Sequence, residues 1–185
     1  DDATAFRGGR AMLALAAERM AMGEADAMIE RGYPLLLSAY GEALDVHTRL
    51  YPGAAAAVDD LRAAGVALGI CTNKPEGLAL RLLEALDMAD LFGGVVGADT
   101  LPVRKPDPAP YRVAVERSGG ALGRSFLVGD TVTDRETARA AGVPCALVTF
   151  GPQGDGVARL EPEATLGHFD ELPDLVERLL PEAAL

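Results

Sequence analysis

Short apolar runs alternate with stretches of helically spaced apolar residues along most of the chain after residue 50. The short runs predict strands, and the stretches between and after them predict helices. Because this alternation builds right-handed βαβ units, we predict an α/β fold, a Rossmann-like parallel sheet with helices on both faces. The predicted strands span residues 66–71, 94–97, 125–128 and 146–150. The predicted helices span residues 54–64, 78–86, 111–117, 136–141 and 172–180.

The part of the chain before residue 50 has a different pattern. It contains no strand-like run, and its apolar residues recur at helical spacing over 11–22 and 25–46. Gly32 and Pro34 interrupt the second stretch, which predicts a kinked helix or two short helices there. We therefore predict a small α-helical cap followed by the α/β core. The predicted domains span residues 1–49 and 50–185.

Composition narrows the class of protein. The 185 residues are 49% apolar, which suits one globular core. No apolar stretch is long enough to span a bilayer and no secretory signal pattern opens the chain, so we expect a cytoplasmic protein with no membrane partner. The net charge is −11, the basic residues are scattered and only 5% of residues are aromatic, which argues against a nucleic-acid partner. The sequence leaves the oligomeric state open, with a homodimer among the alternatives.

The two cysteines do not indicate chemistry of their own. Cys71 and Cys145 lie in or beside apolar runs, so we interpret both as small buried hydrophobic residues and not as a disulfide or a metal site. A cysteine phosphatase would need an Arg six positions after its Cys to hold the phosphate. Gly77 and Gly151 stand at those positions, which excludes that mechanism.

Two acids follow the third predicted strand. Asp130 and Asp134 come after Gly129 at its carboxyl end, and ligands of open α/β sheets bind at that edge. Two neighbouring carboxylates repel each other unless a cation compensates, and Mg²⁺ is a usual partner for carboxylate oxygens. The alternative is a helix start, with Asp130 or Thr131 as the cap and Asp134 in the first turn. Either role explains this segment taken alone.

Other strand ends supply complementary groups. Thr72 and Asn73 follow the first strand, and Lys105 lies in the loop after the second. For phosphoryl transfer, a hydroxyl can hold phosphoryl oxygens, an ammonium can neutralise their charge and the acids can hold Mg²⁺. Taken singly, Thr72 and Asn73 also suit a helix cap, and Lys105 suits a solvated surface. The ordered set is what indicates a site.

Three segments in this order resemble motifs of the haloacid dehalogenase superfamily of phosphohydrolases. Residues 70–75 (ICTNKP) are similar to its second motif, residues 105–108 (KPDP) to its third and residues 128–134 (VGDTVTD) to its fourth. Residues 51–53 (YPG) and 99–106 (DTLPVRKP) are most similar to the phosphoglycolate phosphatase branch.

The resemblance implies an activity and a role for each residue. It implies a Mg²⁺-dependent phosphatase acting on a small phosphomonoester such as 2-phosphoglycolate through an aspartyl-phosphate. Thr72 and Lys105 would be catalytic and would bind the substrate together with Asn73, and Asp130 and Asp134 would hold Mg²⁺. The helical cap before residue 50 would select the substrate.

The first motif of the superfamily, Asp-x-Asp-Gly-Thr after an apolar strand, has no match in the chain. Residues 1–4 (DDAT) have the wrong spacing and no preceding strand. That motif supplies the nucleophile and a central strand, so we expect a leading segment of a few dozen residues to be missing and the chain as given to be inactive without it. One alternative is a non-catalytic remnant or interaction protein of the same fold. A receiver-like phospho-acceptor is disfavoured because receivers place their acids before the hydroxyl and the lysine.

Overall fold

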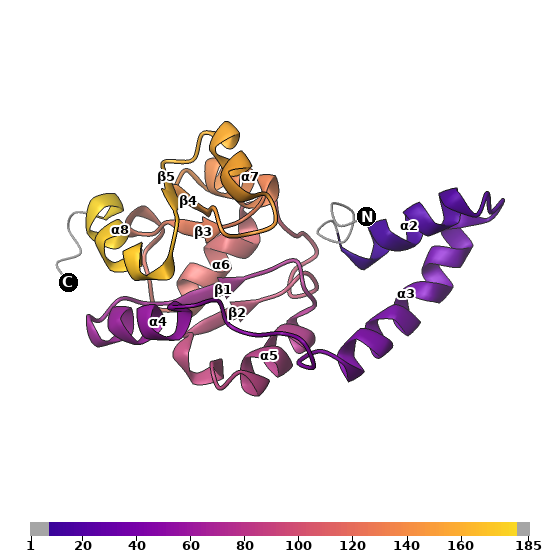
Figure 1. The fold of residues 1–185 in the computed structure, drawn as a ribbon, viewed down its shortest axis with the longest axis horizontal. Coiled ribbons are helices and arrows are strands. Elements are labelled where there is room, and N and C mark those ends of the chain that lie inside the picture. The colour runs from indigo at the N-terminus through magenta and orange to yellow at the C-terminus, as the bar shows by residue number, and fades with distance from the viewer. Residues whose placement is uncertain (1–7, 181–185) are drawn as a thin grey trace. The chain divides into compact units, whose positions relative to one another are not determined.

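The computed structural model describes residues 8–180, and its contacts divide the chain into two compact units. The units are Asp1–Thr48 and Arg49–Leu185. Figure 1 follows the chain through both. The segment of residues 1–4 considered above lies outside the described residues.

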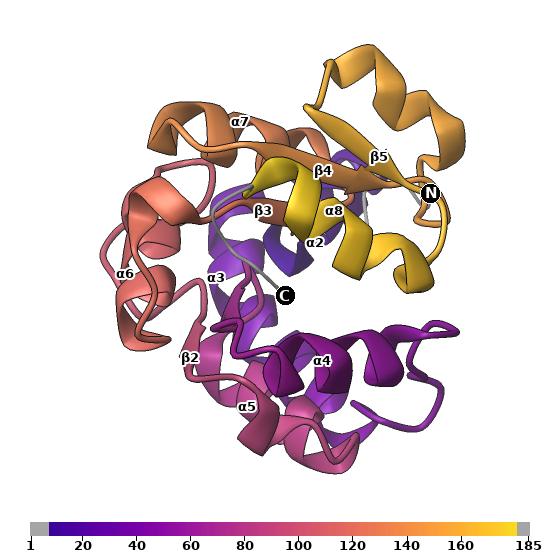
Figure 2. The same ribbon diagram turned by 90° about the vertical axis from the view of Figure 1, so that its left-hand side faces the viewer.

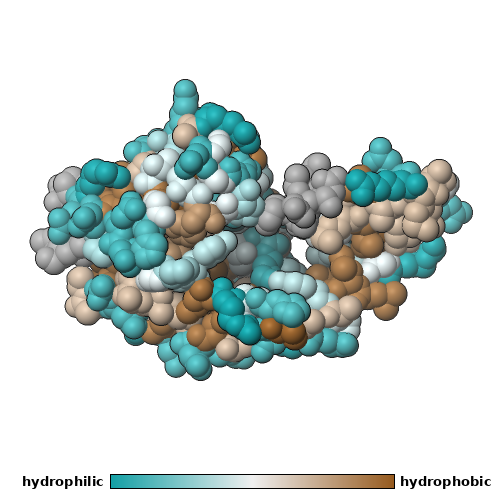
Figure 3. Space-filling model, viewed as in Figure 1, coloured by the Kyte–Doolittle hydropathy of each residue, from teal (hydrophilic) through white to brown (hydrophobic). Residues whose placement is uncertain are grey.

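The first unit consists of two helices packed against each other, α2 (Gly9–Arg19) and α3 (Ala25–Glu42). Of the two predicted alternatives, a kinked helix or two short ones, the structure has one helix with Pro34 inside it. A proline removes one helical hydrogen bond, and packing along α2 holds the turns on either side of it. Apolar side chains remain at the surface of this unit (Figure 3), with Met20 70% and Leu35 71% exposed. Its role as a cap stays a prediction.

The second unit alternates strands and helices. The α/β fold with parallel strands and helices on both faces is confirmed. Its strands are β1 (Gly69–Cys71), β2 (Gly94–Val96), β3 (Leu127–Gly129), β4 (Cys145–Val148) and β5 (Ala164–Leu166). Its α-helices are α4 (Ala54–Ala63), α5 (Glu76–Ala85), α6 (Ala109–Arg117), α7 (Val132–Ala141) and α8 (Leu172–Leu179). Short 3₁₀ turns lie at Ala89–Leu91, Leu122–Arg124, Gly154–Leu160 and Phe169–Glu171.

The strands form two parallel ladders instead of the single sheet predicted. β1 pairs with β2, and the second ladder has the order β3-β4-β5. Within residues 8–180, no strand pairs with the second edge of β1 or of β3. Side chains near both strands nevertheless share a core, because Leu68 before β1 and Phe126 before β3 pack against the same buried cluster.

The core lies on both faces of β4, which is buried along its whole length. Successive strand residues point to opposite faces. Cys145 and Leu147 pack in the cluster with residues of α6 and α7, whereas Ala146 and Val148 pack in the cluster with residues of α4 and α8. Figure 1 and Figure 2 show α7 and α8 on opposite sides of this ladder. Both faces of β4 are therefore covered, and the loops after the strands begin at the edge of this covered layer.

Among residues 8–180, no helix is long and apolar enough to cross a membrane.

Candidate active site

The fourth-motif segment starts a helix and closes on itself. Thr131 is the N-cap of α7, and Asp134 completes a capping box with it. One carboxylate oxygen of Asp134, Oδ2, accepts hydrogen bonds from the Thr131 hydroxyl (2.7 Å) and from the backbone N–H groups of Asp130 (3.2 Å) and Thr131 (3.1 Å). The helix-cap alternative considered from the sequence is therefore present in the structure, with Thr131 as the cap and Asp134 as its partner in the first turn.

The other oxygen of Asp134 joins this helix start to the third-motif loop. Lys105 Nζ lies 2.6 Å from Asp134 Oδ1, and the two side chains are only 11% and 7% exposed. Water screens the attraction between these two charges less than it screens that of a pair on the open surface. The ion pair fixes the Lys105 ammonium at the carboxyl end of β3, and the Lys105–Pro106 peptide bond that follows is cis.

Glycine permits this approach at the end of β3. A Cβ at Gly129 would lie 2.3 Å from Asp134 Cβ and 2.7 Å from its Oδ2, so any side chain would displace the carboxylate. The Val128-Gly129-Asp130 sequence thus has a steric reason: the strand ends in the one residue that lets Asp134 fold back over it.

The second-motif residues reach the same place from β1. Asn73 Nδ2 donates to the backbone oxygen of Lys105 at 3.0 Å, which ties the loop after β1 to the loop after β2. The Thr72 hydroxyl oxygen accepts from the Lys74 N–H at 3.1 Å, and its own proton remains available to a ligand. Thr72 and Asn73 do not cap α5, since the Glu76 N–H at its start donates to Asp99.

Asp130 and Asp134 have opposite electrostatic surroundings. Burial, and then the nearby charge of Asp134, raise the pKa of Asp130, although Lys105 opposes the shift. Burial would also raise the pKa of Asp134, but the Lys105 charge and the hydrogen bonds from Lys105, Thr131 and the Asp130 N–H hold it below its ordinary value. Asp130 forms no ion pair within the described residues, so it is the carboxylate that an added cation would stabilise.

The loop after β4 borders Asp130. A Cβ at Gly151 would lie 3.2 Å from Asp130 Cβ, so this backbone passes directly beside the acid. All five candidate residues follow the carboxyl ends of strands, Thr72, Asn73 and Asp130 directly, Lys105 in the loop after β2 and Asp134 in the first turn of α7. Hydrogen bonds or an ion pair connect all of them except Thr72, which is adjacent to Asn73 in the chain.

Comparison with known proteins identifies the family of this chain. A model of the haloacid dehalogenase-like hydrolase family matches residues 4–142. The chain belongs to this family. Phosphoglycolate phosphatase from Mesorhizobium japonicum is 39% identical over 179 residues, which cover 95% of this chain and 78% of that protein. Phosphoglycolate phosphatase from Cereibacter sphaeroides (strain ATCC 17029) is also 39% identical, with 86% of this chain and 83% of that protein covered.

A solved structure has a similar fold. The crystal structure of a predicted phosphoglycolate phosphatase from Haemophilus somnus 129PT matches with a TM-score of 0.76 and 25% sequence identity. The match covers 90% of this chain and 74% of that one.

A divalent cation is the cofactor implied by resemblance to this hydrolase family, and the described residues of the site offer it one free carboxylate. Residues 8–180 contain no group of three or more His, Cys, Asp or Glu side chains that could hold a metal. Both oxygens of Asp134 are already engaged, whereas Asp130 has a raised pKa and no cationic partner of its own in that range. Mg²⁺ usually keeps several waters and binds through one or two carboxylates and a substrate phosphate. Asp130 fits that pattern, and the ligand role predicted for Asp134 stays a prediction.

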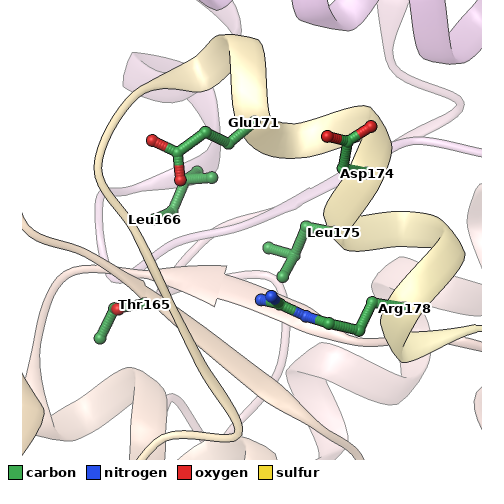
Figure 4. Close-up of a pocket in the computed structure, with 6 residues that line it drawn as sticks. All are labelled: Thr165, Leu166, Glu171, Asp174, Leu175 and Arg178. Atoms are coloured by element: carbon green, nitrogen blue, oxygen red, sulfur yellow. The ribbon is translucent and has the colours of Figure 1, made fainter.

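Neither the two cysteines nor the cavity beside α8 contributes to the site. Burial raises the pKa of the Cys71 thiol to about 11 and that of Cys145 to about 12, so neither is a thiolate at neutral pH. A cavity of about 140 Å³ lies between β5 and α8, and none of the candidate residues lines it (Figure 4). Its lining residues are Thr165, Leu166, Glu171, Asp174, Leu175 and Arg178.

Sequence reasoning missed the supporting groups. The sequence indicates Thr131 only as a helix cap, whereas in the structure its hydroxyl also donates to Asp134. The Thr-x-x-Asp spacing of a capping box was a signal for that contact. The sequence also gives Asp99 no role in capping a helix, yet it accepts from the first N–H of α5 at 2.7 Å. No local pattern indicates that bond, because 23 residues separate its partners.

Proposed function

We propose that this protein is a Mg²⁺-dependent phosphatase that hydrolyses a small phosphomonoester, with 2-phosphoglycolate as the candidate substrate. The observation that carries the proposal is the Lys105–Asp134 ion pair beside the unpaired carboxylate of Asp130. The ion pair holds the Lys105 ammonium in place, and the Asp130 carboxylate beside it can bind a metal cation. A phosphate and its metal ion require these two groups at one edge of the fold. The substrate follows the names of the relatives, both phosphoglycolate phosphatases.

The hydrogen-bond donors that Thr72 and Lys105 do not use within the described residues define how each would contact a phosphate. The Thr72 hydroxyl oxygen accepts a hydrogen bond from the Lys74 N–H, so the Thr72 hydroxyl proton can be donated to a phosphoryl oxygen. Lys105 uses one ammonium hydrogen on Asp134 and keeps the others for phosphoryl oxygens. When bound beside Asp130, Mg²⁺ supplies further neutralisation of the phosphoryl charge.

Two residues orient others in this proposal. Asp134 holds Lys105 and the start of α7 in place, and Asn73 holds the Lys105 backbone. The substrate contact predicted for Asn73 would use its remaining amide atoms. No nucleophile is assigned among residues 8–180, and the resemblance implies an Asp from a segment outside them.

The test measures release of inorganic phosphate from 2-phosphoglycolate, glucose 6-phosphate and p-nitrophenyl phosphate, with Mg²⁺ or with chelator. We expect the 185-residue chain to bind inorganic phosphate with Mg²⁺ but to show no turnover. The chain extended by the coding sequence upstream of Asp1 should hydrolyse 2-phosphoglycolate, and only with Mg²⁺. Clear turnover by the 185-residue chain would refute the missing nucleophile. An extended chain that binds phosphate without hydrolysis would favour the non-catalytic alternative.

A further inference from the structure

The loops after β1 and β2 are joined to each other by several hydrogen bonds. The strand pairing continues from the Thr72 N–H to the Val96 oxygen (2.9 Å) and from the Ala98 N–H to the Lys74 oxygen (3.0 Å). Beyond these backbone bonds, side-chain hydrogen bonds connect the two loops. Glu76, Gly97, Asp99 and Thr100, which we call the inter-loop clamp, join the start of α5 to the turn after β2.

Thr100 is the central member of the inter-loop clamp. Its hydroxyl oxygen accepts from the Gly97 N–H at 2.8 Å, and its proton is donated to the Glu76 carboxylate. The same carboxylate lies 3.5 Å from a guanidinium nitrogen of Arg117, which donates to the Val95 oxygen at 2.8 Å. One hydroxyl therefore connects its own turn, the start of α5 and, through Glu76, helix α6.

The inter-loop clamp is also closed sterically. A Cβ at Gly97 would lie 2.3 Å from the Glu76 backbone nitrogen and 2.5 Å from its Cα. These neighbours are backbone atoms, so they cannot move aside as a flexible side chain would. The two loops touch at this point without intervening atoms, and their separation is fixed there.

The two loops carry groups that must act on one phosphate. Thr72 is on the first loop and Lys105 is on the second, and near the site the loops are joined by the bond from Asn73 to the Lys105 oxygen. We propose that Thr100 and Glu76 are positioning residues that set the distance between the Thr72 hydroxyl and the Lys105 ammonium. This rests on the proposed function of that pair in binding phosphate. Small displacements of such groups weaken their joint action on a ligand.

The experiment measures the affinity of the 185-residue chain for inorganic phosphate in the presence of Mg²⁺, by calorimetry or ³¹P NMR. Thr100→Val keeps the branched shape and removes the hydroxyl. We expect it to weaken phosphate binding about tenfold, in the range that non-contacting residues of a coupled network produce. Thr100→Ser restores the hydroxyl and should restore the affinity. Glu76→Ala tests the same bond from its other end and serves if Thr100→Val does not fold.

Ser125→Ala is the matched control. The Ser125 hydroxyl also bridges two groups, since it donates to the Leu122 oxygen and accepts from the Tyr111 hydroxyl, but it lies before β3, away from the strand ends. Affinity should be unchanged in Ser125→Ala even where thermal unfolding shows lost stability. Equal weakening in Ser125→Ala and Thr100→Val would reduce the effect to general destabilisation and overturn the inference.

Two outcomes separate the inference from the proposed function. If the wild-type chain binds phosphate and Thr100→Val binds it equally well, the inter-loop clamp has no positioning role and the proposed function stands. If the wild-type chain binds no phosphate, the proposed function fails and the inference fails with it.

Discussion

At the scale of single residues, Asp130 and Asp134 show how neighbours determine what a carboxylate does. They are four positions apart, yet the pKa of one is raised and that of the other is lowered. The difference comes from partners: Asp134 receives Lys105, the Thr131 hydroxyl and two backbone N–H groups, whereas Asp130 borders the backbone of Gly151. Asp134 is stabilised as an anion by the fold, and Asp130 would be stabilised by a ligand.

Asp130→Asn should stabilise the protein in chelator. A carboxylate whose folded pKa is raised destabilises the fold above that pKa, and the wild type gains stability as pH falls through it. The amide removes this penalty, so we expect a higher melting temperature than that of the wild type at pH 7. The same variant should lose the rise in melting temperature that Mg²⁺ gives the wild type. An equal Mg²⁺ response in both proteins would exclude Asp130 as the cation site.

Asp134→Asn should have the opposite effect. Removing one partner of a buried ion pair costs about 3 kcal/mol or more because the other charge is left uncompensated. Asp60→Asn, on the exposed side of α4, should change stability by less than about 0.5 kcal/mol. Urea unfolding at pH 7 measures both changes, and similar losses in the two variants would contradict the role of the pair.

The pH dependence of the same variant has a defined sign. The folded pKa of Asp134 is lowered, so the stability it contributes is complete above its ordinary pKa of about 4 and is lost as pH falls through the folded value. Wild-type stability should therefore fall steeply on the acid side of about pH 4, and Asp134→Asn should show a shallower decline there. Urea midpoints measured from neutral pH into this acid range for both proteins test it.

Residue identities at the candidate site were accessible from the sequence, but their division of labour was not. Thr72, Lys105, Asp130 and Asp134 follow strand-like runs in order, which any parallel sheet collects at one edge. Which oxygen of Asp134 meets which donor depends on the path of the loop carrying Lys105, 29 residues earlier in the chain. Hydrophobic periodicity contains no information on that path.

At the scale of elements, α5 begins without a cap from its own segment. Pro75 precedes it and offers no side-chain acceptor, so Asp99 accepts the first N–H from another loop. Asp99→Ala should destabilise the protein by about 1 kcal/mol, the usual value for a lost cap, and Asp99→Asn should retain most of that stability. Asp90→Ala, at an exposed position in the 3₁₀ turn after α5, is the control. Equal unfolding midpoints for Asp99→Ala and Asp90→Ala would show that this bond does not stabilise α5.

The predictability of each element followed the strength of its pattern. The five helices predicted after residue 50 and all four predicted strands are present, with ends shifted by up to four residues. β5 was not predicted because Ala164-Thr165-Leu166 is too short to show a period, and it is recognisable only where it pairs with β4. The separation into two ladders is consistent with the lack of the central strand that the resemblance assigns to the unmatched first motif, because β1 and β3 each keep an unpaired edge among residues 8–180.

At the scale of the whole molecule, the chain carries a net negative charge, whereas a site for phosphate needs local positive charge. The net charge is −11, which by itself disfavours a phosphate ligand. A phosphate can bind only where this field is locally offset. Lys105 and a cation at Asp130 would provide that offset within one shielded place, which is why we expect phosphate affinity to depend on Mg²⁺ far more than on the surface charge.

The second unit should bind phosphate without the first. Both hydrophobic clusters and every candidate residue lie within Arg49–Leu185, so removal of residues 1–48 deletes no described core residue of that unit and no member of the site. A chain of residues 49–185 should therefore unfold cooperatively and bind inorganic phosphate with Mg²⁺ within about twofold of the 185-residue chain, the deviation typical of independent sites. Calorimetry of the two chains makes the comparison. A loss of affinity well beyond that range in a folded 49–185 chain would contradict this prediction and show that phosphate binding depends on the first unit.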